Sequence, residues 1–355
     1  MRVKEIELLN FRNYESQKIQ FHEKANIITG NNAQGKTNLL ESLYLMSLGK
    51  SFRTNRESDF IRFGKEFARA KGTFDRQGRT LEIEFLFQPG QRQTKIDGIK
   101  ITKHIELLEQ VYMVVFSPED LKIVKEEPEK RRKFLDREIC QVKPIYWRNL
   151  SRYKKILLQR NHLLKKESIQ EEELTVWDEE LVRYGAKVIE ERKRFLEILH
   201  RISSGIHHKI TEGKESLILT YEPHVSSEEE FRDLLTNRRK VDLIRRTTTV
   251  GPHKDDFRIE ANGIDLRNFG SQGQQRTAAL ALKLAEILLI QEETGETPIL
   301  LLDDVLSELD QERQRHLIEA LQDVQLFLTT TELSDYLKEN IPDHKLFVVE
   351  QGTIL

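Results

Sequence analysis

Near the start of this 355-residue chain, a glycine loop stands between a short apolar segment, residues 25–29, and a segment of helical apolar spacing that runs through Leu48. The loop, residues 30–37, reads GNNAQGKT and fits the pattern G-x-x-x-x-G-K-[ST]. Such a loop lets backbone N–H groups close around phosphate, while its lysine reaches the β- and γ-phosphate oxygens and its threonine offers a hydroxyl to Mg²⁺. The order of strand, loop and helix therefore predicts an α/β fold that binds ATP and Mg²⁺. The residues expected to hold the nucleotide here are Gly30, Asn31, Asn32, Ala33, Gln34, Gly35, Lys36, Thr37 and Asn38.

A second apolar strand supplies carboxylates for the same chemistry. Residues 299–304 read ILLLDD, so a buried strand would end on Asp303 and Asp304. We expect Asp303 to join Thr37 in holding Mg²⁺, and Asp304 to position the attacking water. An ordinary capped strand end is the alternative, and the glycine loop elsewhere in the chain makes it the weaker one.

A second loop of small residues precedes a long helical segment. Residues 269–276 read FGSQGQQR, and helix-forming residues follow from Thr277 to Gln291. Because a helix N-terminus attracts anions, this loop is a second candidate phosphate site. By itself the pattern is as typical of a plain N-cap loop.

The order of elements predicts a globular head interrupted by a helical arm. Alternating apolar residues and an Asp97–Gly98 turn predict an antiparallel sheet, followed by a buried strand at 111–116. From residue 122 the spacing becomes helical, and matching apolar stripes in 143–164 and 174–202 predict an antiparallel helical hairpin. The expected domains are an ABC-type head of mixed sheet with an antiparallel subdomain, 1–121 and 247–355, and a mostly helical arm, 122–246.

Three local features refine the arm. The stripe in 143–164 is interrupted at Arg160. The acidic run Glu167–Glu173 is expected at the tip of the hairpin, because it is too charged to bury. Ser227, with Glu230 three residues later, predicts a capping box that opens a helix ending near Arg246.

Charge is segregated along the chain although it nearly cancels overall. With 57 Lys+Arg against 59 Asp+Glu the net charge is −2, which excludes a uniformly basic nucleic-acid coat. Residues 122–166 nevertheless hold 15 basic and 5 acidic residues, a balance of +10, and residues 50–79 hold 9 and 4, a balance of +5. Such clusters are what phosphate contacts need, and a solvated helical face is the alternative interpretation. The candidate DNA contacts are Lys50, Arg53, Arg56, Arg131, Arg132 and Lys133.

The sequence predicts a cytoplasmic protein without a membrane partner. Its one cysteine, Cys140, cannot form an internal disulfide or a zinc cluster, which favours a reducing compartment. No stretch approaches ~18 consecutive apolar residues, and charges at Arg2, Lys4 and Glu5 stand where a signal peptide would be apolar. No metal beyond Mg²⁺ is expected.

Taken together, these blocks resemble a known family. Four of them follow the order of Walker A, signature, Walker B and D-loop, which is similar to the ABC-type ATPase heads of the structural-maintenance-of-chromosomes (SMC) class: 30–37, 271–275, 299–304 and 307–310. Further segments resemble, more narrowly, the RecF family of recombination mediators: 9–14 (LNFRNY), 49–53, 116–121 (FSPEDL), 131–136 (RRKFLD) and 251–257. The resemblance covers essentially the whole chain.

The resemblance implies an ATP-dependent switch. It implies that Ser271, Gly273 and Gln274 meet the nucleotide of an opposite protomer, so that ATP holds a homodimer together and ADP releases it. It also implies that Arg12 contacts the nucleotide. Weak, DNA-stimulated hydrolysis would then depend on Lys36, Asp304 and Ser271.

The resemblance further implies a role and partners. Proteins of this family bind duplex DNA and single-strand/double-strand junctions beside gaps, and with RecR and RecO they help to load RecA during recombinational repair and replication restart. Two residues usual in ABC heads are missing, since 116–121 has no Q-loop glutamine and 329–332 reads TTTE in place of a switch histidine. Glu119 and Thr330 are the candidates to replace them.

Other functions are less well supported by the same residues. A transporter ATP-binding subunit would need a membrane partner, and the long basic insertion is atypical of that class. An ATPase-gated nuclease would need a further carboxylate or histidine cluster, and a long-armed chromosome organiser would need a longer insertion.

Overall fold

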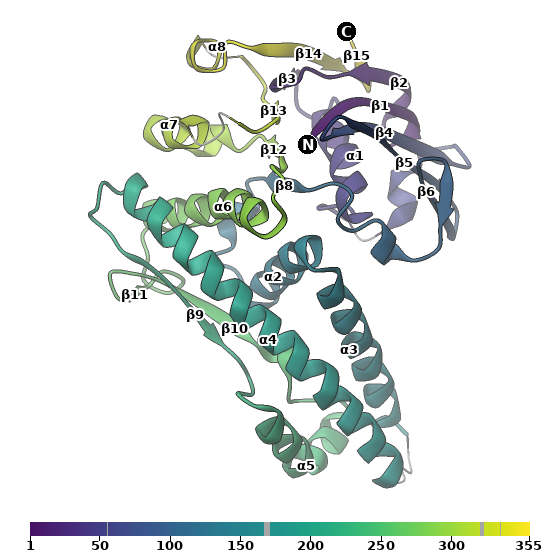
Figure 1. Cartoon of the computed structure of the whole chain (residues 1–355), viewed down its shortest axis with the longest axis vertical. Helices are drawn as coiled ribbons and strands as arrows, with labels where there is room; N and C mark the ends of the chain where they lie inside the picture. The colour runs from purple at the N-terminus through teal and green to yellow at the C-terminus, as the bar shows by residue number, and fades with distance from the viewer. Residues whose placement is uncertain (55, 167–170, 320–322, 334) are drawn as a thin grey trace. The chain divides into compact units, whose positions relative to one another are not determined.

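The computed structural model describes residues 1–54, 56–166, 171–319, 323–333 and 335–355, which form two compact units (Figure 1). The head unit comprises 1–121 with 282–355, and the arm unit comprises 122–281. The first boundary falls where the change to helical spacing puts it, but the chain returns to the head at Leu282 rather than at Thr247. Residues 247–281 belong with the arm because β10 (Asp256–Ala261) pairs with β9 (Leu217–Glu222).

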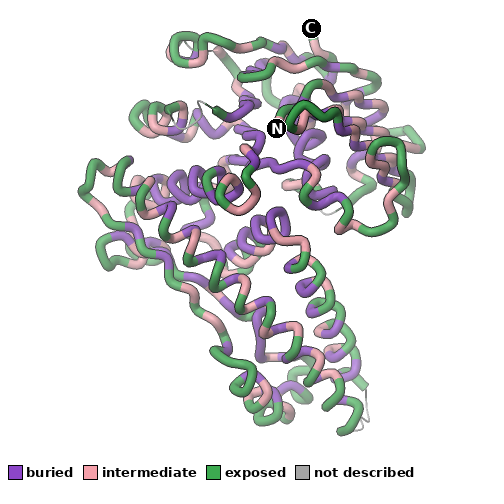
Figure 2. The backbone as a smooth tube through the Cα atoms, viewed as in Figure 1, coloured by how far each residue is buried: buried purple, intermediate pink, exposed green. Residues whose placement is uncertain are grey.

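A largely parallel sheet forms the core of the head unit. Its strand order is β15-β14-β3-β13-β12-β8, and all neighbours are parallel except β14 and β15. The strands are β3 (Ala25–Thr29), β8 (Met113–Phe116), β12 (Ile299–Asp303), β13 (Leu326–Thr329), β14 (His344–Glu350) and β15 (Thr353–Ile354). Every residue of β3, β8, β12 and β13 is buried, as in a sheet covered on both faces (Figure 2). The carboxyl ends of these parallel strands meet at one edge, so the segments after β3, β12 and β13 lie together there.

A second sheet of the head unit is antiparallel throughout, with the order β2-β1-β4-β5-β6-β7. Its strands are β1 (Arg2–Phe11), β2 (Tyr14–Gln20), β4 (Ala68–Arg76), β5 (Arg79–Gln88), β6 (Gln91–Ile96) and β7 (Ile99–Ile101). Burial alternates along β4 and β5, which is the signature of one covered face. Asp97 and Gly98 turn the chain between β6 and β7 with φ of 49° and 77°, as the Asp-Gly signal predicts. The predicted mixed architecture with an antiparallel subdomain is confirmed.

Helices complete the head unit. The helix after the glycine loop, α1 (Lys36–Leu48), is buried on nearly all sides and ends at Gly49, whose φ of 60° suits glycine. The others are α6 (Gln272–Thr294), which begins in the arm unit and continues into the head, α7 (Gln311–Glu319) and α8 (Asp335–Asn340). Short 3₁₀ segments of the head unit are η1 (Glu57–Phe60), η2 (His104–Glu106) and η5 (Leu306–Glu308); η3 (Asp120–Lys122) lies at the boundary, and η4 (Pro252–Lys254) belongs to the arm unit.

The arm unit is mostly helical. It contains α2 (Pro128–Val142), α3 (Pro144–Leu163), α4 (Glu171–Ile210) and α5 (Glu228–Arg245), with a small antiparallel sheet of order β11-β10-β9 that includes β11 (Ile264–Asp265). Helices α3 and α4 pack along each other. Of the acidic run expected at the hairpin tip, residues 167–170 lie outside the described residues. Glu171, Glu172 and Glu173 form the first turn of α4, where negative charge favours a helix N-terminus.

Arg160 corrects the predicted stripe of α3, because it continues the buried face instead of interrupting it. The side chain is fully buried, and its guanidinium donates to Asp178 at 2.6 Å, to Asp242 at 2.7 Å and to the Thr248 hydroxyl at 2.8 Å. A charge can occupy this position because two carboxylates from other elements neutralise it.

The capping signal at Ser227 is confirmed. The Ser227 hydroxyl accepts from the Glu230 amide at 3.1 Å, and the Glu230 carboxylate accepts from the Ser226 amide at 2.6 Å, one residue earlier than in the usual box. The bond from the Glu230 amide satisfies one of the amides that α5 leaves unpaired at its start.

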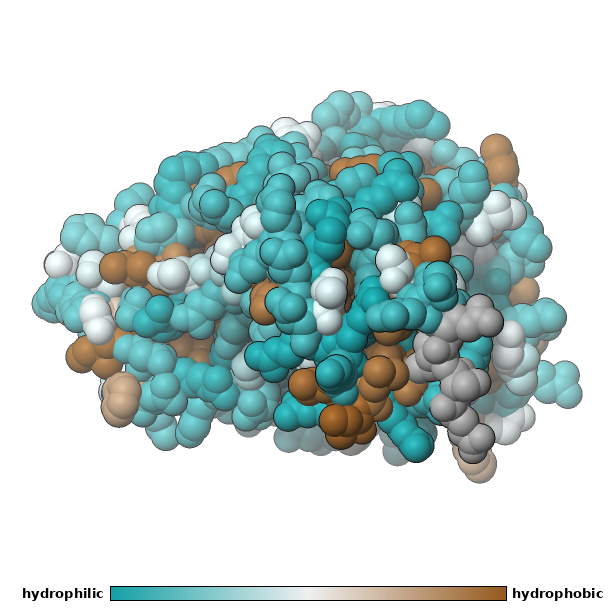
Figure 3. Space-filling model, turned by 90° about the horizontal axis from the view of Figure 1, so that it is seen from below, coloured by the Kyte–Doolittle hydropathy of each residue, from teal (hydrophilic) through white to brown (hydrophobic). Residues whose placement is uncertain are grey.

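Within the described ranges, no helix is both long and apolar enough to cross a membrane. On the face of the molecule drawn in Figure 3, hydrophilic side chains dominate and apolar ones lie in small separate groups. The described atoms of that face therefore form no broad apolar surface.

Candidate nucleotide-binding site

The glycine loop has the backbone that its sequence demands. Gly30 and Gly35 have φ of 139° and 122°, which side-chain-bearing residues rarely adopt. A Cβ on Gly30 would lie 2.4 Å from the carbonyl oxygen of Val349, so that position also has no room for one. Asn31, Asn32 and Ala33 are exposed. The loop is thus closely packed on one side and open to solvent on the other.

Lys36 points back onto its own loop. Its ammonium donates to the carbonyl oxygens of Gly30 and, at 3.1 Å, Asn31. Burial lowers the pKa of Lys36 from its ordinary value, and the carboxylates of Asp304 and Asp303 oppose that shift. A phosphate oxygen carries more negative charge than these carbonyls, so it would be the stronger acceptor for the same ammonium.

The parallel sheet places Asp303 next to α1, the helix that follows the glycine loop. Its Oδ1 accepts from the hydroxyl of Thr37 at 2.8 Å and from that of Thr329, at the end of β13, at 3.1 Å. Burial raises the pKa of Asp303, and the bonds from Thr37 and Thr329 only partly oppose it. A cation would relieve this cost, and carboxylate and hydroxyl oxygens are ligands that Mg²⁺ accepts. The pair therefore fits the expected metal site.

Asp304 lies in a strained conformation directly after this carboxylate. Its φ is 53°, a left-handed value that is uncommon outside glycine and costs of order 1–3 kcal/mol. The Asp304 amide donates to the Thr329 hydroxyl at 3.0 Å, which holds the peptide in place. Strained backbone of this kind persists only where neighbouring contacts hold it, and it is common at functional sites.

Thr329 is a site residue that the sequence analysis missed in favour of its neighbour. Thr330, the candidate replacement for the switch histidine, donates its hydroxyl to the Glu332 carbonyl instead. Thr329 is the last residue of β13 and hydrogen-bonds Asp303, whereas Thr330 follows the strand and its hydroxyl is turned toward Glu332. The run of three threonines at 329–331 indicated that a threonine lies near the site, but it did not show which of the three meets Asp303. Glu119 is exposed in the segment after β8.

Glu41 is a second missed residue. It is fully buried and accepts two 2.7 Å hydrogen bonds from the guanidinium of Arg12, and it also accepts from the Ser51 hydroxyl. Arg12 lies over the ring of Phe60, 5.3 Å from its centroid. In the sequence, Glu41 stands between Leu40 and Leu43 of an apolar helical segment. Because a buried carboxylate needs a cationic partner, its position could have predicted a cation nearby.

Of the head's candidate DNA contacts, Arg53 lies beside the helix that follows the glycine loop. Arg53 donates to the side-chain oxygen of Asn38 at 2.8 Å, and the amide group of Asn38 donates to Asn13 at 2.8 Å. Lys50 and Arg56 are exposed. Arg53 therefore contacts α1, the helix after the glycine loop, and is also part of the basic segment 50–79.

The signature loop opens α6. The Ser271 hydroxyl accepts from the Gln274 amide at 3.2 Å, and the Gln274 side chain accepts from the Ser271 amide at 3.0 Å, which is a reciprocal cap. Gln274 also donates to Glu215 at 2.8 Å. Ser271 is exposed, while Gly273 and Gln274 are partly buried. The loop is therefore a plain N-cap in structure that leaves a serine facing solvent.

The arm's candidate DNA contacts need one correction. Arg131 is buried and pairs with both carboxylate oxygens of Asp256, at 2.7 and 2.6 Å, so it is not available to DNA phosphate. Arg132 is partly buried and donates to the Asp255 carbonyl at 2.7 Å. Lys133 is exposed and pairs with Glu129 at 2.6 Å. The consecutive basic residues identify α2 as a basic segment, but they do not show which of its side chains are buried against the rest of the arm.

A basic stripe on α3 was overlooked. Arg148, Arg152 and Lys155 are exposed at i, i+4 and i+7, so they lie on one face of the helix. Among the described residues, none of the three pairs with a carboxylate. The spacing of these three residues was visible in the sequence, but the prediction chose the consecutive basic residues 131–133 instead.

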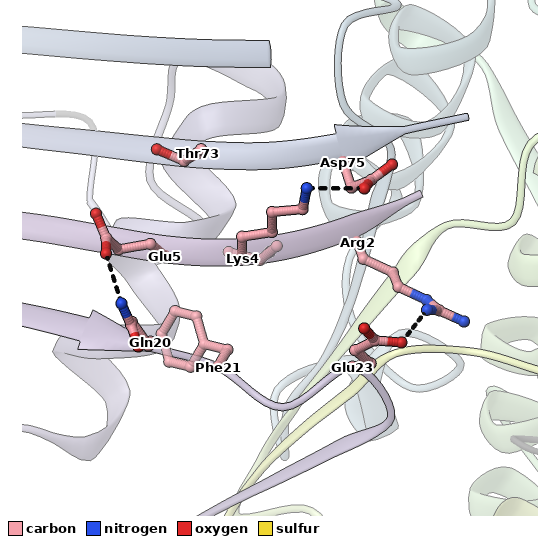
Figure 4. A pocket seen from close by; sticks show the side chains of 9 residues that line it. Arg2, Lys4, Glu5, Gln20, Phe21, Glu23, Thr73 and Asp75 are labelled. Atoms are coloured by element: carbon pink, nitrogen blue, oxygen red, sulfur yellow. Dashed lines mark hydrogen bonds and ion pairs between the residues drawn. The ribbon is translucent and has the colours of Figure 1, made fainter. Parts of the chain in front are cut away.

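A separate groove of about 430 Å³ is lined by β1, β4 and the end of β2 in the antiparallel sheet (Figure 4). Its charges neutralise one another, since Arg2 pairs with Glu23 and Lys4 pairs with Asp75 at 2.9 Å. Gln20 donates to Glu5 there. Among the described residues that line it, the groove therefore contains no unpaired charge to attract phosphate.

Comparison with known proteins gives a consistent picture. The family model described as "RecF/RecN/SMC N terminal domain" matches residues 2–353. The chain is 45% identical to the DNA replication and repair protein RecF of Clostridium acetobutylicum over 360 residues, covering all of this chain and 99% of that protein. It is also 45% identical to RecF of Alkaliphilus oremlandii over 365 residues, covering both in full.

Solved structures agree. The recombination mediator protein RecF-ATP in the RecFOR pathway superimposes with a TM-score of 0.92 at 38% identity, covering 100% of this chain and 97% of that one. An SMC head bound to the C-terminal winged-helix domain of ScpA superimposes with a TM-score of 0.58 at 19% identity over 100% and 98% of the two chains. This last likeness concerns the fold alone.

Proposed function

This chain belongs to the RecF family of the RecF/RecN/SMC class, and we propose from that premise that ATP switches it between states that bind and release DNA in replication and repair. The observation that carries the proposal is the 2.8 Å contact of Thr37 with Asp303, which unites a P-loop and a strand-end carboxylate in one site. The full-length similarity to RecF relatives disfavours a transporter subunit.

Nucleotide binding is proposed at the glycine loop. The amides of residues 30–37 would surround the phosphates, and Lys36 would exchange its carbonyl partners for phosphate oxygens. Thr37 and Asp303 would hold Mg²⁺, whose chemistry is to neutralise charge on the phosphates. Asp304 would orient the attacking water, and Arg12, held by Glu41, would lie beside the nucleotide.

Hydrolysis is proposed to need a second copy of the chain. Ser271 is exposed at the N-terminus of α6, where backbone amides favour an anion. In the proposed dimer Ser271, Gly273 and Gln274 would contact the γ-phosphate held by the partner. Loss of that phosphate would remove a contact shared by both protomers, so slow hydrolysis would reset the dimer.

DNA binding is proposed through backbone phosphates without base readout. In the head the candidate contacts remain Lys50, Arg53 and Arg56, and in the arm Arg132 and Lys133. To these we add the exposed stripe of Arg148, Arg152 and Lys155, whose charges have no carboxylate partner among the described residues.

The proposed setting follows from the relatives. Two of them are described as recombination mediators in the RecFOR pathway, so we propose that this chain acts with RecR and RecO at double-stranded DNA and gap junctions, and helps RecA loading. The proposed compartment is the cytoplasm.

The testing experiment is fluorescence-anisotropy binding to a short labelled duplex in three states: with a non-hydrolysable ATP analogue, with ADP and without nucleotide. Tight, salt-sensitive binding with the ATP analogue alone is expected. Lys36→Ala is the control, since it should remove the difference between the states. Equal binding in all three states would contradict the switch.

A further inference from the structure

The loop residue Gln34 is tied to the far end of the chain. Its carbonyl oxygen accepts from the Gly352 amide at 2.9 Å and from the side-chain amide of Asn13 at 2.7 Å. Its side-chain oxygen accepts from the Gln351 amide at 2.7 Å. Three donors from two distant segments therefore converge on one residue of the glycine loop.

These bonds determine which way the next amide points. The peptide between Gln34 and Gly35 is trans, so its N–H points opposite to its carbonyl. With the carbonyl held toward Asn13 and Gly352, the Gly35 N–H is directed away from them. Gly35 precedes Lys36 in the phosphate-binding pattern, and its amide is one of the groups that such a loop offers to phosphate.

The approach of the C-terminal turn is as close as backbone allows. A Cβ on Gly352 would lie 2.3 Å from the carbonyl oxygen of Asn13, and both are backbone positions that cannot rotate away. Gln351 and Gly352 have φ of 46° and 76°, the left-handed pair of a tight hairpin between β14 and β15. Strand β14 pairs in parallel with β3, which ends at the loop, so the sheet itself delivers the turn to Gln34.

We infer that Gly352, Gln351 and Asn13 are positioning residues of the nucleotide site, which hold the Gln34–Gly35 peptide in the orientation that binds phosphate. The inference rests on the proposed function, because it names further residues of the same ATP site. None of the three belongs to the glycine-loop motif, and two lie within the last five residues of the chain.

The chain provides a matched control. Asp97 and Gly98 form the same kind of turn, with φ of 49° and 77°, but a Cβ on Gly98 would meet nothing within 4 Å. Gly352→Ala and Gly98→Ala therefore impose similar backbone strain, and only the first displaces Asn13. Asn13→Leu is a second variant, similar in size to asparagine, which removes the side-chain donor to Gln34 without adding charge, and with it the acceptor of the Asn38 side chain.

The experiment measures binding of fluorescent ATP and ADP analogues, the KM and kcat for ATP, and the melting temperature without nucleotide. Gly352→Ala and Asn13→Leu are expected to weaken binding and raise KM by about tenfold or more, with kcat at saturation changed less than about twofold. Gly98→Ala should match the wild type. If Gly352→Ala does not fold, Asn13→Leu decides.

Unchanged affinity in a folded Asn13→Leu or Gly352→Ala variant would overturn the inference while leaving the proposed function intact. A lower melting temperature with unchanged nucleotide affinity would likewise overturn the inference, since the contacts would then only stabilise the fold. If the wild type bound neither analogue, the proposed function would fail, and this inference with it.

Discussion

Thr37 and Asp303 stand 266 positions apart in the chain, yet the hydroxyl of Thr37 donates a 2.8 Å hydrogen bond to the Asp303 carboxylate. Thr37 belongs to the helix that follows β3, and Asp303 ends β12, with only β13 between the two strands. Parallel strands place their carboxyl ends at one edge, so the contact is a direct product of the strand order.

Removing the charge of Asp303 should separate metal binding from nucleotide binding. Asp303→Asn is expected to keep metal-free ATP affinity but to lose most of the gain that Mg²⁺ brings, with hydrolysis reduced by roughly 100-fold or more. Isothermal titration with and without Mg²⁺, and a phosphate-release assay, measure the two effects. Asp343→Asn, at an exposed carboxylate, is the control. Full stimulation by Mg²⁺ in the variant would contradict the assignment.

A bulky cation at the signature serine should act only between protomers. Ser271 is exposed, so Ser271→Arg is expected to fold and bind nucleotide normally while losing ATP-dependent dimerisation. Sedimentation velocity with a non-hydrolysable ATP analogue measures the dimer. Ser226→Arg, also exposed, controls for the added charge. A normal ATP-dependent dimer of the Ser271 variant would rule out the proposed contact in trans.

The basic stripe of α3 should determine part of the salt dependence of DNA binding. Replacing Arg148, Arg152 and Lys155 by alanine is expected to reduce the magnitude of the slope of log K against log salt by up to about 3, because each phosphate contact releases about 0.9 counterions when it forms and the variant would lack these contacts. Anisotropy titrations at several salt concentrations measure the slope. An alanine triple at Arg238, Lys240 and Arg245 of α5 matches the change in net charge. Equal slopes in the two triples would exclude a specific role for the stripe.

The buried guanidinium of Arg160 should be essential to the arm's stability. Arg160→Met leaves Asp242 buried without its cation, and we expect unfolding free energy to fall by about 3–5 kcal/mol. Urea unfolding followed by circular dichroism measures the change. Arg152→Met, on the exposed face of the same helix, should cost far less. A loss below about 1 kcal/mol for Arg160→Met would contradict the network's importance.

His253 should make stability depend on pH in the mildly acidic range. Its Nε2 donates to the Thr248 carbonyl, and its Nδ1 accepts from Tyr153 at 2.6 Å. Burial lowers the pKa of His253 to about 4, so between that value and an unfolded pKa near 6.5 the unfolded state binds more protons. The free energy of unfolding should therefore fall as pH drops from about 6.5 to about 4, by up to about 3 kcal/mol from this group.

Substitution tests that assignment. His253→Gln retains hydrogen-bonding groups but does not titrate, so urea unfolding at a series of pH values should show a shallower acid dependence than the wild type. His162→Gln, at an exposed position, should leave the dependence unchanged. Identical pH profiles for wild type and His253→Gln would refute the role of this histidine.

Local spacing was enough to predict the core of the candidate site. The glycine loop, the strand before it and the strand that ends on Asp303 are each encoded within a few residues, because backbone conformation and strand burial leave short, regular patterns. The same holds for the cap at Ser227 and the Asp97–Gly98 turn. These features needed no knowledge of what lies across the molecule.

Only the tertiary structure decided which polar side chains meet. Arg131 looked like a surface charge until Asp256, 125 positions later, was found against it. Arg160 looked like a break in an apolar stripe because its acidic partners come from other elements. The approach of Gly352 to Gln34 likewise leaves no local mark on either segment. Charge and sequence spacing describe one segment at a time, whereas ion pairs and close backbone contacts depend on the packing of segments that are distant in the chain.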